Sequence, residues 1–144
     1  PSIKKKYGPT ILFNGDDIRR IFILKGYTYK ERHDALMKYS KLAKFITNQN
    51  INVIFTVVGM IDDVRYWNKK NIKNYVEIYI KSNLKNVISK KMKKIYRKKT
   101  KNIVGIDIKP EYPKKPNIII KNDFKKNIKA YSAELLKKIE NHLS

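Results

Sequence analysis

Four short apolar runs, separated by longer amphipathic stretches, constrain the fold of this 144-residue chain more than any other feature. The runs are rich in β-branched residues, which is typical of buried strands in a parallel sheet. They span residues 10–14, 52–58, 75–80 and 117–121. The intervening helix-like stretches span residues 29–49, 62–72, 83–99 and 130–143. This alternation predicts an α/β fold with a parallel sheet.

The remaining long stretch, residues 100–116, contains Gly105 and three prolines and is predicted to be a loop. Loops of this length in compact domains are usually functional. The chain has no internal repeat and no linker, so we expect a single domain over residues 1–144. Functional groups of such a sheet are expected at the carboxyl ends of its strands.

The charge of the chain invites a nucleic-acid interpretation, because 34 Lys and Arg against 12 Asp and Glu give a net charge of +22. Of these cations 29 are Lys, and the chain also has 22 Ile and 14 Asn, a combination typical of AT-rich genomes. The five Arg are therefore the more informative cations, because their planar groups bind phosphates in pairs of hydrogen bonds. A basic nucleic-acid-binding α/β module without catalysis stays open as an alternative.

Several site classes are disfavoured by what the sequence lacks. It has no cysteine, which excludes a thiol nucleophile, and only two histidines, which disfavours a histidine-rich metal site. No apolar run approaches the roughly 20 residues that span a bilayer, and the start lacks the apolar core of a signal peptide. We expect a cytoplasmic protein with no membrane partner.

The densest polar cluster, residues 14–20 (NGDDIRR), follows the first predicted strand directly. A carboxylate at a strand end can orient a hydroxyl nucleophile or bind magnesium through water, and an Arg one turn later can hold an anionic substrate. Equally, Asp16 or Asp17 can be no more than the N-cap of the next helix. In the second polar segment, Thr28 and Glu31 have the spacing of a capping box at the start of the long helix.

Taken in order, four motifs resemble the adenylylsulfate kinase family over nearly the whole chain. The family's D-G-D-x-x-R corresponds to residues 14–19, and its F-[ST]-x-x-D-R to residues 27–32. Its F-T-G-I-D-x-P-Y-E-x-P loop corresponds to residues 103–113, and its L-Y-K-K-A lid helix to residues 95–99.

The resemblance implies a three-layer P-loop kinase fold with a parallel sheet. It also implies an enzyme, a transferase that uses ATP and Mg²⁺ to move the γ-phosphate to the 3′-hydroxyl of a small nucleotide acceptor. A lid over both nucleotides would span residues 92–107, unless this region is only a solvated basic helix beside a loop. Nucleic acid is then not an expected partner.

The site residues carry over from the same resemblance. Asp16 would lie beside the acceptor hydroxyl, as base or orienting group, and contact magnesium through water. Arg19 and Arg32 would hold the anionic end of the acceptor. Further acceptor-binding positions would be Tyr27, Arg65, Ile103, Gly105 and Ile106. Arg97 and Lys98 would belong to the lid on the ATP side.

The chain departs from the family pattern at the phosphate-binding loop, since no G-x-x-x-x-G-K-[ST] occurs in the 144 residues. The family places that motif before the segment matched by residues 14–19. We therefore expect the natural polypeptide to carry a β-strand and a P-loop before Pro1.

The acceptor pocket departs as well. Ile103 replaces one of two family aromatics, Ala35 replaces an Asn, residues 37–38 (MK) replace an Arg pair, and residues 58–62 replace I-S-P-x-R. These changes favour an altered acceptor such as cytidine diphosphoramidate, the acceptor of similar kinases in capsule polysaccharide clusters. Drift within a true adenylylsulfate kinase, and a catalytically dead remnant of the fold, are the rival interpretations.

The resemblance also implies a homodimer, for which four aromatic residues could supply an interface, although core packing would explain them equally well. These residues are Tyr66, Trp67, Tyr75 and Tyr79.

Overall fold

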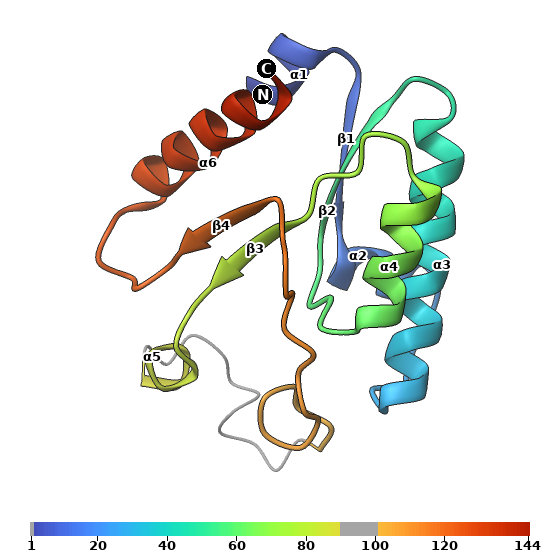
Figure 1. Cartoon of the computed structure of the whole chain (residues 1–144). Coiled ribbons are helices and arrows are strands. Elements are labelled where there is room, and N and C mark those ends of the chain that lie inside the picture. The colour runs from blue at the N-terminus through green and yellow to red at the C-terminus, as the bar shows by residue number, and fades with distance from the viewer. Residues whose placement is uncertain (1, 90–100) are drawn as a thin grey trace. The chain divides into compact units, whose positions relative to one another are not determined.

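The computed structural model describes residues 2–89 and 101–144 (Figure 1). Contacts within the chain divide it into two compact units. Unit 1 comprises Pro1–Tyr75 and Ile108–Tyr112, and unit 2 comprises Val76–Asp107 and Pro113–Ser144. A single kinase domain over residues 1–144 stays a prediction.

Unit 1 contains a two-stranded parallel sheet in which β1 (Thr10–Asn14) pairs with β2 (Asn52–Thr56). Its helices are α1 (Ser2–Tyr7), α2 (Gly15–Ile21), α3 (Tyr29–Thr47) and α4 (Asp62–Asn71). In the register of the sheet Asn14 lies opposite Thr56. The carboxyl ends of both strands therefore meet at one edge, where α2 begins without an intervening loop.

The start of α3 confirms the predicted capping box. Thr28 Oγ1 accepts a hydrogen bond from the Glu31 N–H at 3.3 Å, and Glu31 Oε2 accepts one from the Thr28 N–H at 2.9 Å. These reciprocal bonds satisfy two backbone donors of the first turn. The buried face of α3 then packs into the core of unit 1, which consists of Ile18, Ala35, Leu36, Tyr39, Ile61 and Val64.

The sheet of unit 1 is less buried and shorter than the apolar runs predict. Leu12 in β1 is 66% exposed, and β2 ends at Thr56 although the apolar run continues through Val58. Among the described strands β1 has β2 as its one neighbour, which leaves part of its apolar surface uncovered.

Unit 2 contains a second parallel pair, β3 (Ile78–Lys81) and β4 (Ile118–Lys121), in which Ile78 lies opposite Ile118. Its helices are α5 (Leu84–Ser89) and α6 (Ile128–Leu143), and α6 packs against β4. Ile118 and Ile120 of β4 are buried. The predicted basic helix is present as far as Ser89, and the rest of it lies outside the described residues.

The described elements confirm the predicted α/β class, because both strand pairs are parallel and helices follow the strands along the chain. Within residues 2–89 and 101–144, no helix combines the length and the hydropathy that crossing a bilayer requires.

Candidate functional site

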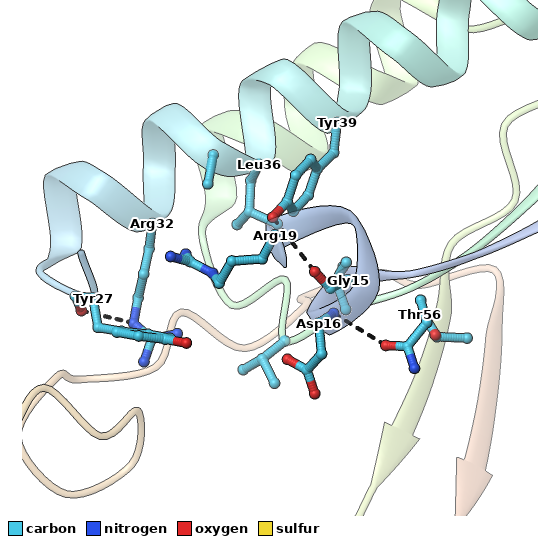
Figure 2. A pocket seen from close by; sticks show the side chains of 12 residues that line it. Gly15, Asp16, Arg19, Tyr27, Arg32, Leu36, Tyr39 and Thr56 are labelled. Carbon is cyan, nitrogen blue, oxygen red and sulfur yellow. Dashed lines mark hydrogen bonds between the residues drawn. The ribbon is translucent and has the colours of Figure 1, made fainter. Parts of the chain in front are cut away.

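A cavity of about 220 Å³ lies in unit 1, where the carboxyl ends of β1 and β2 meet (Figure 2). Crevices at this edge of a parallel sheet are the usual place for ligands in α/β folds. The cavity is lined by Asn14, Gly15, Asp16, Arg19, Tyr27, Arg32, Ala35, Leu36, Tyr39, Thr56, Val57 and Val58.

The junction between β1 and α2 places Asp16 on the cavity wall. Asn14 is the N-cap of α2, since its Oδ1 accepts a hydrogen bond from the Asp16 N–H at 3.1 Å. The alternative prediction, that Asp16 or Asp17 is the N-cap of this helix, is therefore wrong. Asp17 instead forms an ion pair with Arg20, whereas the Asp16 carboxylate makes no hydrogen bond or ion pair among the described residues.

Gly15 is needed at this junction because of space rather than backbone conformation. A Cβ at this position would lie 2.8 Å from Val57 Cγ1 and 3.1 Å from the Thr56 carbonyl oxygen. The start of α2 can therefore approach the end of β2 closely only with glycine, and Gly15, Thr56 and Val57 all line the cavity.

Arg19, one turn after Asp16, is held by backbone carbonyls. Its Nη1 donates to the Leu24 oxygen at 2.9 Å and to the Gly26 oxygen at 2.6 Å. Its guanidinium carbon lies 4.3 Å from the centroid of the Tyr27 ring, within the range of a cation–π interaction. These contacts fix the guanidinium group beside the cavity.

Arg32, from the first turns of α3, contacts the same ring. Its Nε donates to the Tyr27 carbonyl at 2.9 Å, and its guanidinium carbon lies 5.2 Å from the ring centroid (Figure 2). Burial, followed by the positive charge of Arg19, lowers the pKa of Arg32. Two neighbouring guanidinium groups repel one another, and an anionic ligand that contacts both would relieve this repulsion.

Sequence reasoning missed part of the cavity wall. Tyr39 donates its hydroxyl to the Gly15 oxygen at 3.5 Å and stacks on Phe55, with ring centroids 5.3 Å apart. Burial raises the pKa of Tyr39. Its spacing of seven residues from Arg32 places it on the same face of α3, a signal that helical periodicity could have supplied. The other lining residues that were missed are Leu36, Thr56 and Val57.

Within unit 1 the structure brings together four of the five predicted site residues. Asp16, Arg19, Tyr27 and Arg32 line the cavity, whereas Arg65 does not. Arg65 donates to the Gly59 oxygen at 2.6 Å, as well as pairing with Asp62. Ile103, Gly105 and Ile106 belong to unit 2, and Arg97 and Lys98 lie outside the described residues.

Asp16 is the one carboxylate among the residues that line the cavity. No group of three or more His, Asp or Glu side chains among the described residues could form a protein cage for a metal. Mg²⁺ is usually bound through one or two carboxylates together with substrate phosphates. Asp16 can supply such a carboxylate from the cavity wall.

Comparison with known sequences gives three consistent matches. A family model described as adenylylsulphate kinase matches residues 2–121. The cytidine diphosphoramidate kinase of Campylobacter jejuni is 32% identical over 141 residues, covering 95% of this chain and 82% of that protein. The adenylyl-sulfate kinase of Clostridium kluyveri is 27% identical over 117 residues, covering 77% of this chain and 59% of that protein.

Comparison with solved structures identifies the fold. The APS kinase CysC of Mycobacterium tuberculosis, solved in complex with AMPPNP and APS, superimposes with a TM-score of 0.82 at 18% sequence identity. The match covers 96% of this chain and 83% of the other. The α/β kinase fold implied by the sequence motifs is confirmed.

Proposed function

Since the chain belongs to the adenylylsulphate kinase family and is a nucleotide kinase, we propose that it transfers the γ-phosphate of ATP to the 3′-hydroxyl of a nucleotide acceptor. The observation that supports this most directly is the convergence of one carboxylate, Asp16, and two guanidinium groups, those of Arg19 and Arg32, on one cavity. Phosphoryl transfer needs little more from a protein than positioning and charge stabilisation.

Each of these groups has a distinct part in the proposed reaction. Arg19 and Arg32 bind the anionic end of the acceptor, with Tyr27 beside them. Asp16 accepts a hydrogen bond from the acceptor hydroxyl and so orients its oxygen toward the γ-phosphorus. A bond forms between that oxygen and the γ-phosphorus, the bond from the γ-phosphorus to the bridging oxygen breaks, and ADP leaves. The hydroxyl proton passes to Asp16 and from there to solvent.

We propose Mg²⁺ as the metal of this reaction, with Asp16 contacting it through water. Bound Mg²⁺ supplies neutralisation of the charge on the transferring phosphate. The Asp16 carboxylate has no partner among the described side chains, so a hydrated cation can approach it without breaking an existing bond.

For the acceptor we propose cytidine diphosphoramidate rather than adenylylsulfate, which would give the protein a role in capsule modification. The support is chemical. Ala35 and Val58, both at departures from the family pattern, line the cavity, and Tyr27 and Tyr39 are its aromatic residues. Tyr27 already contacts two guanidinium groups. A pyrimidine depends less than adenine on further stacking partners.

The proposal is tested by measuring phosphate transfer from γ-labelled ATP with the full-length protein and each acceptor in turn. We expect transfer to both, with a higher kcat/KM for cytidine diphosphoramidate. A higher kcat/KM for adenylylsulfate would refute the altered acceptor and leave the kinase assignment in place. Transfer to neither acceptor in the presence of Mg²⁺ would refute the 3′-hydroxyl transfer itself.

A further inference from the structure

Glu111 connects two segments that line the cavity, although its own side chain is not part of the lining. Glu111 Oε1 accepts a hydrogen bond from the Tyr29 hydroxyl at 2.9 Å, and Oε2 accepts one from the Asp62 N–H at 2.5 Å. Tyr29 is the first residue of α3, and Asp62 is the first residue of α4. One carboxylate therefore bridges the starts of two helices in unit 1.

The backbone of Glu111 strengthens the same connection. Its N–H donates to the Met60 oxygen at 3.2 Å, and its carbonyl accepts from Arg65 Nη2 at 2.7 Å. We call Tyr29, Met60, Asp62, Arg65 and Glu111 the Glu111 clasp. Only 11% of the Arg65 side chain is exposed, so its hydrogen bonds to backbone carbonyls lie largely out of solvent. The clasp thus fixes the segment between β2 and α4 from two sides.

The clasp also supplies a cap that the local sequence lacks. The N-cap residue of α4 is Ile61, which has no side-chain hydrogen-bond acceptor and makes no cap bond. Glu111 provides the missing acceptor and places a negative charge at the amino end of the helix, where the helix dipole favours it. The hydrogen bond to Glu111 raises the pKa of Tyr29, as expected for a phenol held in its neutral form.

The two bridged segments continue directly into the cavity. Arg32 lies one turn after Tyr29 in α3, and Val57 and Val58 precede Met60 in the chain. Separating the start of α3 from the start of α4 would move both of these walls. Tyr29 is 43% exposed, so we expect its hydrogen bond to Glu111 to contribute little to the free energy of unfolding.

We propose that Glu111 is a positioning residue, which sets the separation between the Arg32 wall and the Val58 wall of the acceptor cavity. The kinetic part of this inference rests on the proposed kinase function. The residue acts through Tyr29 and Asp62 and touches no reacting atom, so it governs acceptor binding more than the chemical step.

The kinetic test compares Glu111→Ala and Glu111→Gln in the full-length protein. We expect Glu111→Ala to raise the acceptor KM about tenfold while kcat changes less than about twofold, which corresponds to a loss of about 1.4 kcal/mol in acceptor binding. Glu111→Gln should keep a KM close to that of the wild type, because its carbonyl can accept from Asp62 and its amide can donate to the Tyr29 oxygen. Glu134→Ala, a control in α6 of unit 2, should leave KM and kcat unchanged.

An unchanged acceptor KM in Glu111→Ala, or an equal rise of the acceptor KM in Glu111→Ala and Glu111→Gln, would overturn the positioning role while leaving the kinase assignment intact.

A second readout does not need activity. Amide exchange at Asp62 should accelerate in Glu111→Ala, and the NMR signals of Arg32 and Val58 should shift, whereas Glu134→Ala should change neither. If these signals match those of the wild type, the clasp is refuted even if the protein phosphorylates no acceptor at all.

Discussion

Arg19 and Arg20 are neighbours in the sequence, but Arg19 lines the cavity and Arg20 is exposed to solvent. Arg19 is bound by two backbone carbonyls and by the Tyr27 ring on the cavity wall. The Arg20 side chain is 79% exposed and pairs with Asp17. Successive residues of a helix point about 100° apart, so only one of the two can face the cavity. Residue type alone could not distinguish them.

This pair allows a matched test of anion binding. Arg19→Ala should raise the acceptor KM by about ten- to a hundredfold, because hydrogen bonds to charged groups contribute about 1.5–3 kcal/mol. Arg20→Ala should leave the KM within about twofold, since an exposed ion pair contributes little. Steady-state kinetics with varied acceptor concentration measures both, and equal effects of the two substitutions would contradict the assignment of Arg19.

Asp16 is predicted to act mainly in the chemical step. Asp16→Asn should lower kcat by about 10²–10⁴-fold with little change in acceptor binding, because the amide cannot accept the hydroxyl proton. Asp17→Asn, which removes only the partner of Arg20, serves as the control and should keep nearly full activity. Full turnover in Asp16→Asn would show that its carboxylate has no catalytic part.

At the scale of elements, the loop between α2 and α3 holds both arginines through its backbone. The carbonyls of Leu24 and Gly26 accept from Arg19, and the carbonyl of Tyr27 accepts from Arg32. A Cβ at Gly26 would lie 1.9 Å from the Glu31 carboxyl group. Glu31 would have to leave Thr28, so the loop and the capping box depend on one another.

Gly26→Ala should therefore lower stability and acceptor affinity together. We expect a loss of about 0.5–2 kcal/mol in the free energy of unfolding, the range for a lost helix cap. Denaturant unfolding measures this loss, and the acceptor KM should rise in the same variant because Arg19 loses a fixed acceptor. A variant that loses stability with an unchanged KM would contradict the role of the loop in placing Arg19.

The capping box also predicts a dependence of stability on pH. Hydrogen bonds from Thr28 lower the pKa of Glu31 below its ordinary value of 4.5. A carboxylate with a lowered pKa in the folded state stabilises the fold above its unfolded pKa, and this stabilisation disappears as the pH falls through the folded value. Between pH 5 and pH 3 the free energy of unfolding should therefore fall less in Glu31→Gln than in the wild type, because the variant has no carboxylate at this position to protonate. Chemical unfolding at several pH values measures the difference, and identical curves would contradict it.

Elements that depend on local patterns could be predicted, and those that depend on distant partners could not. The start of α3 followed from Thr28 and Glu31, which are three residues apart. The N-cap of α2 did not, because Asn14, Asp16 and Asp17 are all good caps and only the backbone path selects Asn14. Glu111 lies 82 residues from Tyr29 and 49 from Asp62, so no spacing rule reveals their bonds.

At the scale of the whole molecule, the net charge of +22 indicates less about the ligand than the residues of the cavity do. Mixed-sequence DNA should not inhibit phosphate transfer at physiological salt, because binding that depends on lysine charge alone is weak and sensitive to salt. An activity assay with increasing DNA concentration, together with a gel shift at two salt concentrations, measures this. Tight DNA binding at physiological salt without any phosphate transfer would instead favour the nucleic-acid-binding alternative.

The capping of α4 by Glu111 has a consequence for folding during translation. The cap is synthesised 49 residues after the helix that needs it. At elongation rates of about 5–20 residues per second, Glu111 is synthesised roughly 2–10 s after the amino end of α4. During that interval Ile61 offers no substitute acceptor, so α4 acquires this cap only after residue 111 has left the exit tunnel.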